Sequence, residues 1–481
     1  MKRYPIEGQS ARRQLWTRIK GGIIITLFII FALWAGLWWL LLLPLLIDFY
    51  FTRLINWRYL RQHPNPLVRT LGTLLEDVVF VVVMVSLIFT YFFQNFAIPS
   101  SSLEKTLLIG DYLFVNKLSY GPRVPMTPIA LPLAHNTAFG HKSYLDKPSL
   151  PYRRLRGLGR VERNDLVVFN FPAGDTVALN MPNPDYYTLC SAYGRDAVWA
   201  DRAQFGEIIY RPVDRRDHYV KRCIGLPGEF ISIKDNQVYI DGKAIENPRN
   251  MQLNYFVQTD GTPLSQSLLD ELEINDRDVQ LLYSYQSGDE TDLSGFIRQM
   301  HLTMAPIEGR GYGLIYHLPL TEEMKGRLQS EPYIRAMDVE ITPRESTGEV
   351  YPLGLRTGWT RDNYGPLFIP RRGMKIYLTP TTVATYSRCI RNYEGHSLEQ
   401  RPDGTYLVDG KPQTTYTFGM DYYFMLGDNR HMSADSRYWG FVPEDHIVGK
   451  PAFLWLSINN ERPLLSGGIR WGRMMRLIHG K

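Results

Sequence analysis

The sequence is poor in the residues that build disulfide frameworks and metal centres. Its 481 residues include only three cysteines, Cys190, Cys223 and Cys389. Three thiols allow at most one intramolecular disulfide, and their simplest interpretation is as small buried side chains. The sequence contains no C-x-x-C pair and no H-E-x-x-H motif. We therefore expect no zinc or other metal site, and no cofactor.

Net positive charge is also scarce over most of the chain. The formal net charge is +6, but residues 1–20 hold six basic side chains against Glu7 and account for +5 of it. A nucleic-acid-binding protein usually spreads basic residues over its folded domain, so we expect no nucleic acid partner. The 44% of hydrophobic and 21% of charged residues predict a packed core. The length indicates two or three structural units.

Charge is absent from residues 21–47, an apolar run of 27 residues. This exceeds the ~20 residues that cross a bilayer. No small-residue cleavage site follows, so residues 21–50 are predicted to be a retained membrane anchor. A second apolar run, residues 78–93, reaches spanning length only if residues 94–97 are included. We assign it to a segment of residues 74–97, with a buried core helix or strand as the alternative.

The orientation of these two segments is only partly determined by their flanking charges. The basic loop between them, residues 51–73, contains four arginines, whereas the residues after Phe93 are nearly neutral. The positive-inside rule places this loop in the cytoplasm and the chain after Ala97 outside. The same rule places the basic N-terminal segment, residues 1–20, inside, although a first segment that spans once would place it outside. Gly36 and Pro44 would permit a kinked or re-entrant first segment, and the sequence leaves this open.

The chain after residue 97 has mostly strand-like patterns. Short β-branched and aromatic runs occur at residues 111–115 and 165–171, and residues 230–240 alternate about an Asp235-Asn236 turn, which predicts a hairpin. Strand-like pattern returns near Met374 and Tyr422.

Residues 246–356 differ from this pattern. Leu268, Leu269 and Leu272 have helical spacing, and Thr321 is placed to cap a helix with Met324 and Leu328 on one face. The predicted fold class is therefore a mostly β catalytic domain, residues 98–245 and 357–481, with an inserted α+β lobe at 246–356. Two transmembrane helices precede it.

Three clusters of residues carry possible chemistry. Ser100, Ser101 and Ser102 follow the second apolar segment, where a serine-rich step is often only a linker or a cap. Lys221 stands in an apolar strand-like stretch that ends at Gly225–Gly228, where an exposed edge lysine would be the ordinary interpretation. The third cluster is residues 427–443, in which Asp435 and Arg437 could form a structural ion pair.

These clusters, in this order and directly after a membrane segment, resemble the type I signal peptidase family, whose bacterial members use a Ser–Lys dyad. The serine box of that family is similar to residues 98–120 and its second box to residues 165–172. Its lysine box is similar to residues 221–228 and its last box to residues 427–443. The resemblance covers roughly residues 74–245 and 357–481 and leaves the insert without a counterpart.

The resemblance implies Ser102 as the nucleophile and Lys221 as its general base. It implies an oxyanion hole made by the Ser100 side chain and the backbone N–H of Ser102. Ser433 would orient the lysine, and Asp435 and Arg437 would support the site. The residues implied to line two shallow apolar substrate pockets, suited to alanine-sized side chains, are Ile98, Pro99, Leu103, Leu107, Tyr219 and Val220.

The residues themselves fit this chemistry. A serine hydroxyl needs a base to take its proton, and a lysine serves as a base only when burial keeps it neutral. The apolar neighbours Val220, Cys223 and Ile224 are consistent with such burial. His218 is an alternative base, although in a strand it would point away from the face of Lys221. The family commonly has glycine, methionine and proline where this chain has Ser101, Leu103 and Lys105.

The predicted function is a membrane-bound serine endopeptidase that removes N-terminal signal peptides from exported preproteins. The predicted location is the inner membrane of a Gram-negative bacterium, multi-pass, with the catalytic domain on the periplasmic side. Partners would be preprotein signal peptides and membrane lipid, with the export machinery as a further candidate. The resemblance favours an outer N-terminus, against its charge. The alternatives are a catalytically inactive, membrane-anchored binding protein on the same scaffold and a Ser–Lys self-cleaving regulator.

Overall fold

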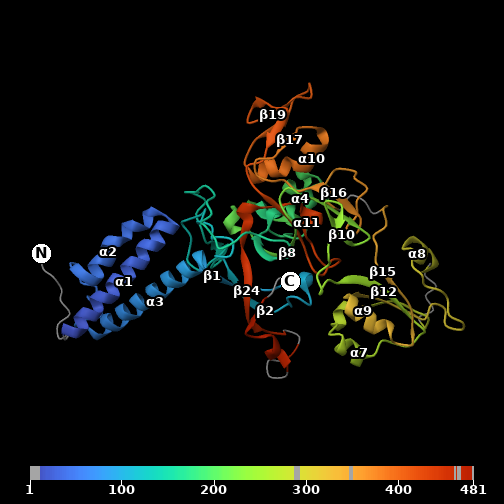
Figure 1. Cartoon of the computed structure of the whole chain (residues 1–481), viewed down its shortest axis with the longest axis horizontal. Coiled ribbons are helices and arrows are strands. Elements are labelled where there is room, and N and C mark those ends of the chain that lie inside the picture. The colour runs from blue at the N-terminus through green and yellow to red at the C-terminus, as the bar shows by residue number, and fades with distance from the viewer. Residues whose placement is uncertain (1–10, 287–292, 346–349, 460–461, 463–466, 479–481) are drawn as a thin grey trace. The chain divides into compact units, whose positions relative to one another are not determined.

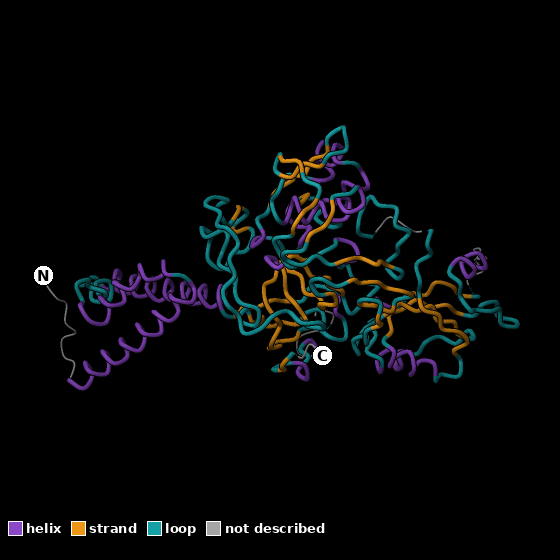
Figure 2. Tube along the Cα trace, turned by 45° about the horizontal axis from the view of Figure 1, so that its top comes forward, coloured by secondary structure: helices purple, strands orange, loops and turns teal. Residues whose placement is uncertain are grey.

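The protein is described by a computed structural model that covers residues 11–286, 293–345, 350–459, 462 and 467–478. The chain divides into two compact units. The first comprises residues 1–94 and 116–160, and the second residues 95–115 and 161–481. Helices dominate the first unit and strands the second, as the purple and orange segments of Figure 2 show.

The first unit contains two helices that are long and apolar enough to cross a membrane. They are α1, Ala11–Ala35, and α3, Pro66–Tyr91. A shorter apolar helical stretch lies between them, formed by η1 (Leu37–Leu42), α2 (Leu43–Ile47) and η2 (Asp48–Thr52). In Figure 1 these are the blue helices.

The bounds of the second apolar segment differ from the predicted 74–97. Helix α3 begins at Pro66, after an Asn65 cap whose side chain accepts a hydrogen bond from the Leu67 N–H. Proline is favoured at the first position of a helix because its missing N–H is not needed there. The helix gains its length at this end and stops at Tyr91. Residues 93–97, which were expected to complete the span, form strand β1 instead.

The second unit is built around an eight-stranded sheet. The strand order is β1-β2-β24-β5-β8-β22-β23, and β25 also pairs with β24. The bounds are β1 Phe93–Ala97, β2 Asp111–Asn116, β5 Leu166–Asn170, β8 His218–Gly225, β22 Tyr422–Leu426, β23 Val442–Pro443, β24 Ile447–Ser457 and β25 Arg476–Leu477. All residues of β5 are buried, so this strand lies in the interior. Its neighbour β8 pairs with it antiparallel.

A second sheet, of four strands, contains the predicted hairpin. Its order is β11-β10-β9-β16, with bounds Lys243–Ala244, Gln237–Ile240, Phe230–Lys234 and Tyr364–Phe368. Lys234 lies opposite Gln237, so the turn falls at Asp235 and Asn236, and the prediction is confirmed. Both turn residues have positive φ, the conformation that two-residue hairpin turns require.

Residues 253–339 form a third sheet with its own hydrophobic core. The order is β13-β14-β12-β15, with bounds Gln280–Ser284, Leu314–Leu320, Leu253–Thr259 and Ile334–Val339. Helices α7 (Gln266–Glu271), α8 (Leu293–Gln299) and α9 (Glu322–Gln329) belong to the same region. Thr321 caps α9, and Met324 and Leu328 are buried, as the sequence predicted. The region packs Leu268, Leu269 and Leu272 into this core.

Smaller elements complete both units. The two-stranded sheets are β3–β4 (Thr137–Ala138 and His141–Lys142), β6–β7 (Thr176–Ala178 and Ile208–Tyr210) and β17–β21 (Lys375–Tyr377 and Thr415–Thr417). Strands β18 (Leu398–Gln400), β19 (Tyr406–Val408) and β20 (Lys411–Pro412) form a three-stranded sheet. The remaining α-helices are α4 (Tyr186–Tyr193), α5 (Arg195–Ala200), α6 (Arg202–Phe205), α10 (Pro380–Arg388) and α11 (Ser436–Trp439).

Candidate active site

Ser102 lies in a short 3-10 turn, Ser101–Leu103, shortly after β1. Its side chain is buried, and its Oγ lies 3.3 Å from the Oγ of Ser100. The turn is held because Leu103 and Leu107 are packed in a hydrophobic cluster below it. The backbone N–H of Asn429 also donates to the Ser102 carbonyl at 3.1 Å. The sequence therefore places two serine hydroxyls side by side on a fixed turn.

Lys221 lies on β8, opposite Val167 of the buried strand β5. Only 3% of the residue is exposed. Burial lowers the pKa of Lys221 to about 8, because the charged ammonium loses its hydration there. Asp435 and Asp428 raise the pKa in part, and Arg437 lowers it. The next residue on this face, Cys223, is fully buried, and burial raises the pKa of its thiol, so it adds no charge.

Gly427 connects the nucleophile turn with the last box. Arg222 of β8 lies opposite Leu426 of β22, so Gly427 follows at the strand end next to Lys221. A Cβ on Gly427 would lie 2.2 Å from the Ser433 Oγ and 2.6 Å from the Ser102 carbonyl oxygen. Only glycine fits between these two residues. The predicted nucleophile, base and orienting serine thus meet around one glycine.

Ser433 itself is buried, and within the described part of the chain its Oγ has no hydrogen-bond partner. A buried hydroxyl without a partner is costly. Its hydroxyl is therefore available for a hydrogen bond, and the sequence predicts the Lys221 amine as its partner. The structure thus brings Ser433 to the site, while its action on Lys221 remains a prediction.

Asp435 and Arg437 form a fully buried ion pair. The Arg437 Nε and Nη2 donate to Asp435 at 2.9 and 2.8 Å. The other Asp435 contacts are to backbone, because it accepts from the N–H of Gly427 at 3.1 Å and caps α11. Arg437 in turn lowers the pKa of Asp435. The pair holds Gly427 in position and keeps the carboxylate near Lys221 occupied.

A second buried ion pair was missed by the sequence reasoning. Arg222 donates to both carboxylate oxygens of Asp428 at 2.7 Å, and Thr106 adds a further bond to Asp428 at 2.7 Å. This pair ties β8 to the last box and to the serine turn. A charged residue on the buried strand next to Lys221 was the available signal, since a buried arginine needs a carboxylate.

The predicted substrate-pocket residues fall into two groups. Ile98, Leu103, Leu107 and Val220 pack together in one hydrophobic cluster, and of these four residues Val220 is the partly exposed one. Pro99 is exposed. Tyr219 stacks on Phe171 with ring centroids 4.5 Å apart. The structure therefore makes Pro99, Val220 and Tyr219 the members of this set that are open to contact.

His218 lies at the start of β8, opposite Asn170, and contacts Phe96 edge to face at 4.8 Å. Side chains alternate between the two faces of a strand, so His218 and Lys221 point to opposite sides. This agrees with the interpretation that His218 is not the base. Among the described residues no group of three or more His, Cys, Asp or Glu is arranged to hold a metal ion.

The insert touches the serine turn directly, which no sequence pattern had indicated. Lys105 donates from its Nζ to the carbonyls of Leu272 and Glu273 at 3.0 and 2.7 Å. Its φ is +67°, which proline, the residue common at this position in the family, cannot adopt. Gln252, just before β12, exchanges backbone hydrogen bonds with Asp428 and Arg430. The insert is thus bonded to both the serine turn and the last box.

Comparison with known proteins bears on this arrangement. The chain matches the family described as "Signal peptidase, peptidase S26" over residues 71–290 and 372–456. It is 23% identical to the signal peptidase I of Buchnera aphidicola subsp. Schizaphis graminum over 462 residues, which is 94% of this chain and 98% of that protein. It is 24% identical to the signal peptidase I of Haemophilus influenzae over 409 residues, 83% of this chain and 73% of that one.

A shorter and stronger similarity relates the chain to the signal peptidase I of Helicobacter pylori strain J99. The two are 38% identical over 69 residues, 12% of this chain and 24% of that protein. The family match covers well over half of the chain and includes Ser102, Lys221 and Ser433 within its bounds. The chain therefore belongs to the signal peptidase family, peptidase S26, and is a signal peptidase I protease.

Proposed function

We propose that this protein is a membrane-bound serine endopeptidase that removes N-terminal signal peptides from exported preproteins, with Ser102 as nucleophile and neutral Lys221 as general base. The position of Gly427 is the observation that carries the proposal, because this residue contacts both Ser102 and Ser433. It follows Leu426, which pairs with Arg222, the neighbour of Lys221 on β8. The similarity to signal peptidases I supports the choice of substrate.

The proton path follows from burial. Above its pKa of about 8, the Lys221 amine is largely neutral and can accept the proton of the Ser102 hydroxyl as Oγ attacks the scissile carbonyl carbon. The resulting ammonium then gives this proton to the leaving amine of the mature protein. In the second half the same amine takes a proton from the water that attacks the acyl-enzyme carbonyl. The ammonium then gives this proton to the Ser102 Oγ as the signal peptide leaves, which restores the neutral amine.

The negative charge that develops on the carbonyl oxygen needs donors. The Ser102 backbone N–H and the Ser100 hydroxyl lie on the same turn and are proposed to form the oxyanion hole. One such donor contributes about 10²–10³ in rate.

Location and partners belong to the same proposal. The apolar helices α1 and α3 support association with a membrane, and the short connection from Tyr91 to Ser102 keeps the nucleophile close to it. We propose a multi-pass protein of the inner membrane with the second unit on the periplasmic side. Its partners would be preprotein signal peptides and membrane lipid, with the export machinery as a further candidate.

The test is cleavage of a preprotein by purified full-length protein in detergent, beside Ser102→Ala and the neighbouring control Ser101→Ala. Ser102→Ala should fold and insert but lose cleavage, whereas Ser101→Ala should keep most of it. Retention of more than a few per cent of activity by Ser102→Ala would mean that another residue is the nucleophile. Binding of the preprotein without cleavage by the wild type would instead favour the inactive binding protein.

A further inference from the structure

The first apolar segment does not run straight. Helix α1 ends at Ala35, and Gly36 has a φ of +142°, which a residue with a side chain rarely adopts. The stretch Leu37–Thr52 then returns along α1, because η1, α2 and η2 all contact that helix. Gly21, ten residues into α1, meets Tyr50 so closely that a Cβ there would lie 2.7 Å from the tyrosine Cβ. Residues 21 and 50 are therefore neighbours.

The bend of this hairpin meets the end of α3. The aromatic ring of Phe31 lies 5.4 Å from those of Trp39 and Tyr91 in edge-to-face contacts. Trp34 also contacts Tyr91, and its indole N–H donates to the Arg156 carbonyl. Ala35 and Tyr91 are buried together in this cluster. Tyr91 is the last residue of α3, so the bend lies beside the C-terminal end of that helix.

The opposite end holds the two chain segments that carry basic charge. A Cβ on Gly72, in the first turns of α3, would lie 2.7 Å from the Cβ of Leu60, so the loop packs on the start of α3. Asp48 fixes the exit from the hairpin, because its carboxylate accepts hydrogen bonds from the N–H groups of Leu54 and Ile55 and from the Trp57 indole. Tyr50 thus lies beside Gly21 of α1, directly after Lys20, and the loop lies beside the start of α3.

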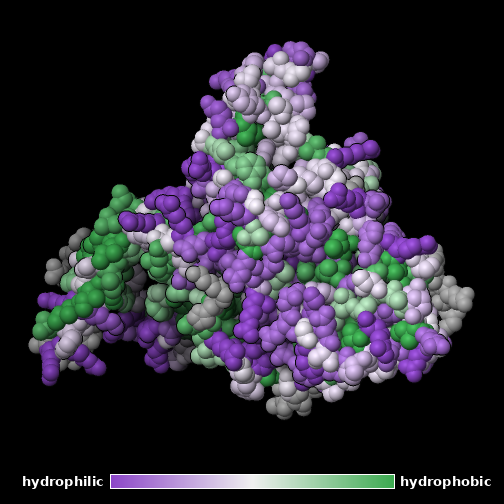
Figure 3. All heavy atoms as spheres, turned by 45° about the vertical axis from the view of Figure 1, so that its right-hand side comes forward, coloured by the Kyte–Doolittle hydropathy of each residue, from purple (hydrophilic) through white to green (hydrophobic). Residues whose placement is uncertain are grey.

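Charge and hydrophobicity follow this arrangement. The basic residues of 1–20 are Lys2, Arg3, Arg12, Arg13, Arg18 and Lys20, and those of the loop and the start of α3 are Arg53, Arg58, Arg61 and Arg69. Between the two ends the helices expose large apolar side chains, among them Leu27, Ile30, Leu41, Phe80 and Val81. In Figure 3 apolar side chains of this kind form the green area at the left. At ~1.5 Å per residue Leu37–Thr52 extends ~24 Å, somewhat less than the ~30 Å hydrocarbon core.

We propose that the first apolar segment is a helical hairpin that enters the membrane and returns, so that residues 1–20 and the loop 53–65 face the cytoplasm together. The membrane path then has three antiparallel helical rods, α1, Leu37–Thr52 and α3, and only α3 leads out to the catalytic unit. This inference rests on the proposed periplasmic location of that unit. It removes the conflict that the charges posed, because both basic segments now obey the positive-inside rule.

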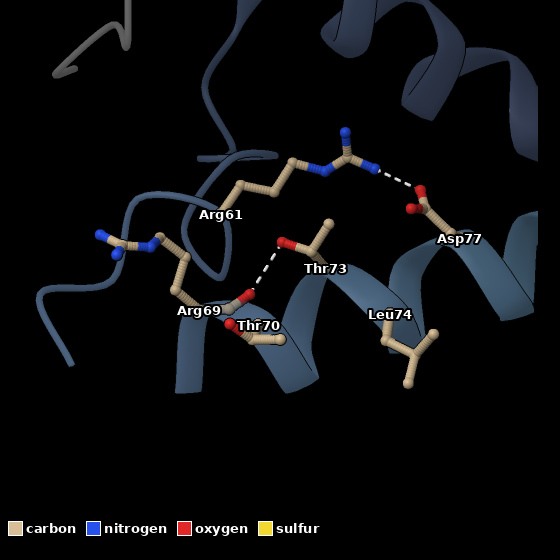
Figure 4. A pocket seen from close by; sticks show the side chains of 6 residues that line it. All are labelled: Arg61, Arg69, Thr70, Thr73, Leu74 and Asp77. Carbon is tan, nitrogen blue, oxygen red and sulfur yellow. Dashed lines mark hydrogen bonds and ion pairs between the residues drawn. The ribbon is translucent and has the colours of Figure 1, made fainter. Parts of the chain in front are cut away.

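In the proposed orientation the basic end of the helices faces the cytoplasmic leaflet of the membrane, whose lipids carry negative charge. Polybasic segments beside membrane helices are attracted to such lipids. Figure 4 shows a shallow pocket at the start of α3, lined by Arg61, Arg69, Thr70, Thr73, Leu74 and Asp77. Arg61 is bound to Glu76 and Asp77 at 2.6 Å, while Arg69 points away from them. This end of the helices is thus basic overall, and ion pairs of Arg61 link its loop to α3.

The basic residues of 116–160, such as Arg153 and Arg156, do not oppose this orientation. The nearest of these basic residues, Lys117, follows Tyr91 by 26 positions in the sequence, and Arg153 follows it by 62. The positive-inside rule counts charges within about 15–20 residues of a membrane helix, and longer segments translocate largely regardless of charge. The residues that directly follow α3, 92–111, contain Lys105 against Glu104 and Asp111. They carry no positive excess.

Cysteine accessibility tests the hairpin in the full-length protein in cells. The background is Cys190→Ala, because Cys223 and Cys389 are buried. Single cysteines are then introduced as Ser10→Cys in the basic N-terminal segment, Gln62→Cys in the exposed loop and Glu308→Cys on the exposed surface of the insert. Cells with a permeabilised outer membrane are treated with a membrane-impermeant maleimide before or after lysis of the inner membrane. Each variant is first shown to process a preprotein.

The hairpin requires that Ser10→Cys and Gln62→Cys behave alike. We expect both to react only after the inner membrane is lysed, and Glu308→Cys to react before. Reaction of Ser10→Cys in unlysed cells, with Gln62→Cys protected, would show that the first segment spans once and would overturn the hairpin while leaving the location intact. Protection of Glu308→Cys would overturn the proposed location, and the match between residues 10 and 62 would still decide the hairpin.

Discussion

The eight-stranded sheet and the four-stranded sheet β13-β14-β12-β15 differ in whether they bury charged side chains. Near the proposed site the eight-stranded sheet and the segment after β22 bury charged residues, among them Lys221, Arg222, Asp428, Arg430, Asp435 and Arg437. The core of the insert is apolar, and in its described residues the buried polar side chains are neutral ones such as Asn254, Gln258 and Thr259. Its ion pairs, such as Arg327 with Glu271, lie near the surface.

This difference indicates where the chain accepts an energetic cost for function. Burying a charge costs several kcal/mol unless it is paired, and even a paired charge often stabilises no better than an apolar substitute. The region 246–356 avoids this cost, because its core is apolar. Near Lys221 the chain holds two complete buried ion pairs, Arg222–Asp428 and Arg437–Asp435. Burial lowers the pKa of Lys221 itself. The ion pairs occupy the carboxylates that would otherwise hold Lys221 charged.

The largest loss of stability is expected when one of the buried charges loses its partner. Asp428→Asn leaves Arg222 buried beside a neutral amide, and loss of one partner of a buried pair costs about 3–5 kcal/mol of stability. The matched control is Glu271→Gln, which removes one of the two carboxylate partners of Arg327 near the surface and should leave unfolding unchanged. Denaturant unfolding in detergent measures both. Equal, small effects would mean that the two sheets do not differ in this respect.

Ser100→Ala tests whether the polar groups on the serine turn act on the transition state. We expect kcat to fall by about 10²–10³ with little change in unfolding, since one oxyanion donor is removed. Ser101→Ala, on the same turn, serves as the control and should be nearly silent. A Ser100→Ala enzyme with unchanged kcat would assign the donor to another group.

A smaller effect is expected where the two sheets meet. Lys105→Met removes the hydrogen bonds from the serine turn to the Leu272 and Glu273 carbonyls, and hydrogen bonds of charged groups contribute about 1.5–3 kcal/mol. Because the turn carries Ser102, we expect kcat to fall by roughly tenfold, with KM little changed. Lys105→Arg should recover part of the rate. A change in stability alone, at constant kcat, would mean that the insert does not position the nucleophile.

Local signals explain what could be predicted from the sequence. The turn at Asp235 and Asn236, the Thr321 cap and the burial of Met324 and Leu328 each depend on residues within a few positions of one another. The serine, lysine and last boxes were found because a known family preserves their order, and the structure brings Ser102, Ser433 and the strand of Lys221 together.

The contacts that escaped prediction are distant in sequence. Arg222 and Asp428 are 206 positions apart, and Lys105 and Glu273 are 168 apart, so no periodicity or cap could indicate either pair. The return of the chain at Gly36 escaped for a different reason. An apolar run has the same composition whether it crosses a bilayer once or turns back, and only packing such as that of Tyr50 on Gly21 distinguishes the two.

The pH dependence of kcat/KM, compared between the wild type and Lys221→Arg, tests the central claim most directly. With the pKa of Lys221 lowered to about 8, the base is protonated and inactive below that pH. The account predicts that the wild-type rate rises with pH through neutrality and levels off above about pH 8–9. It also predicts that Lys221→Arg is inactive, since arginine stays protonated in proteins. A rate that peaks near pH 6, or an active Lys221→Arg enzyme, would contradict it and direct attention to His218.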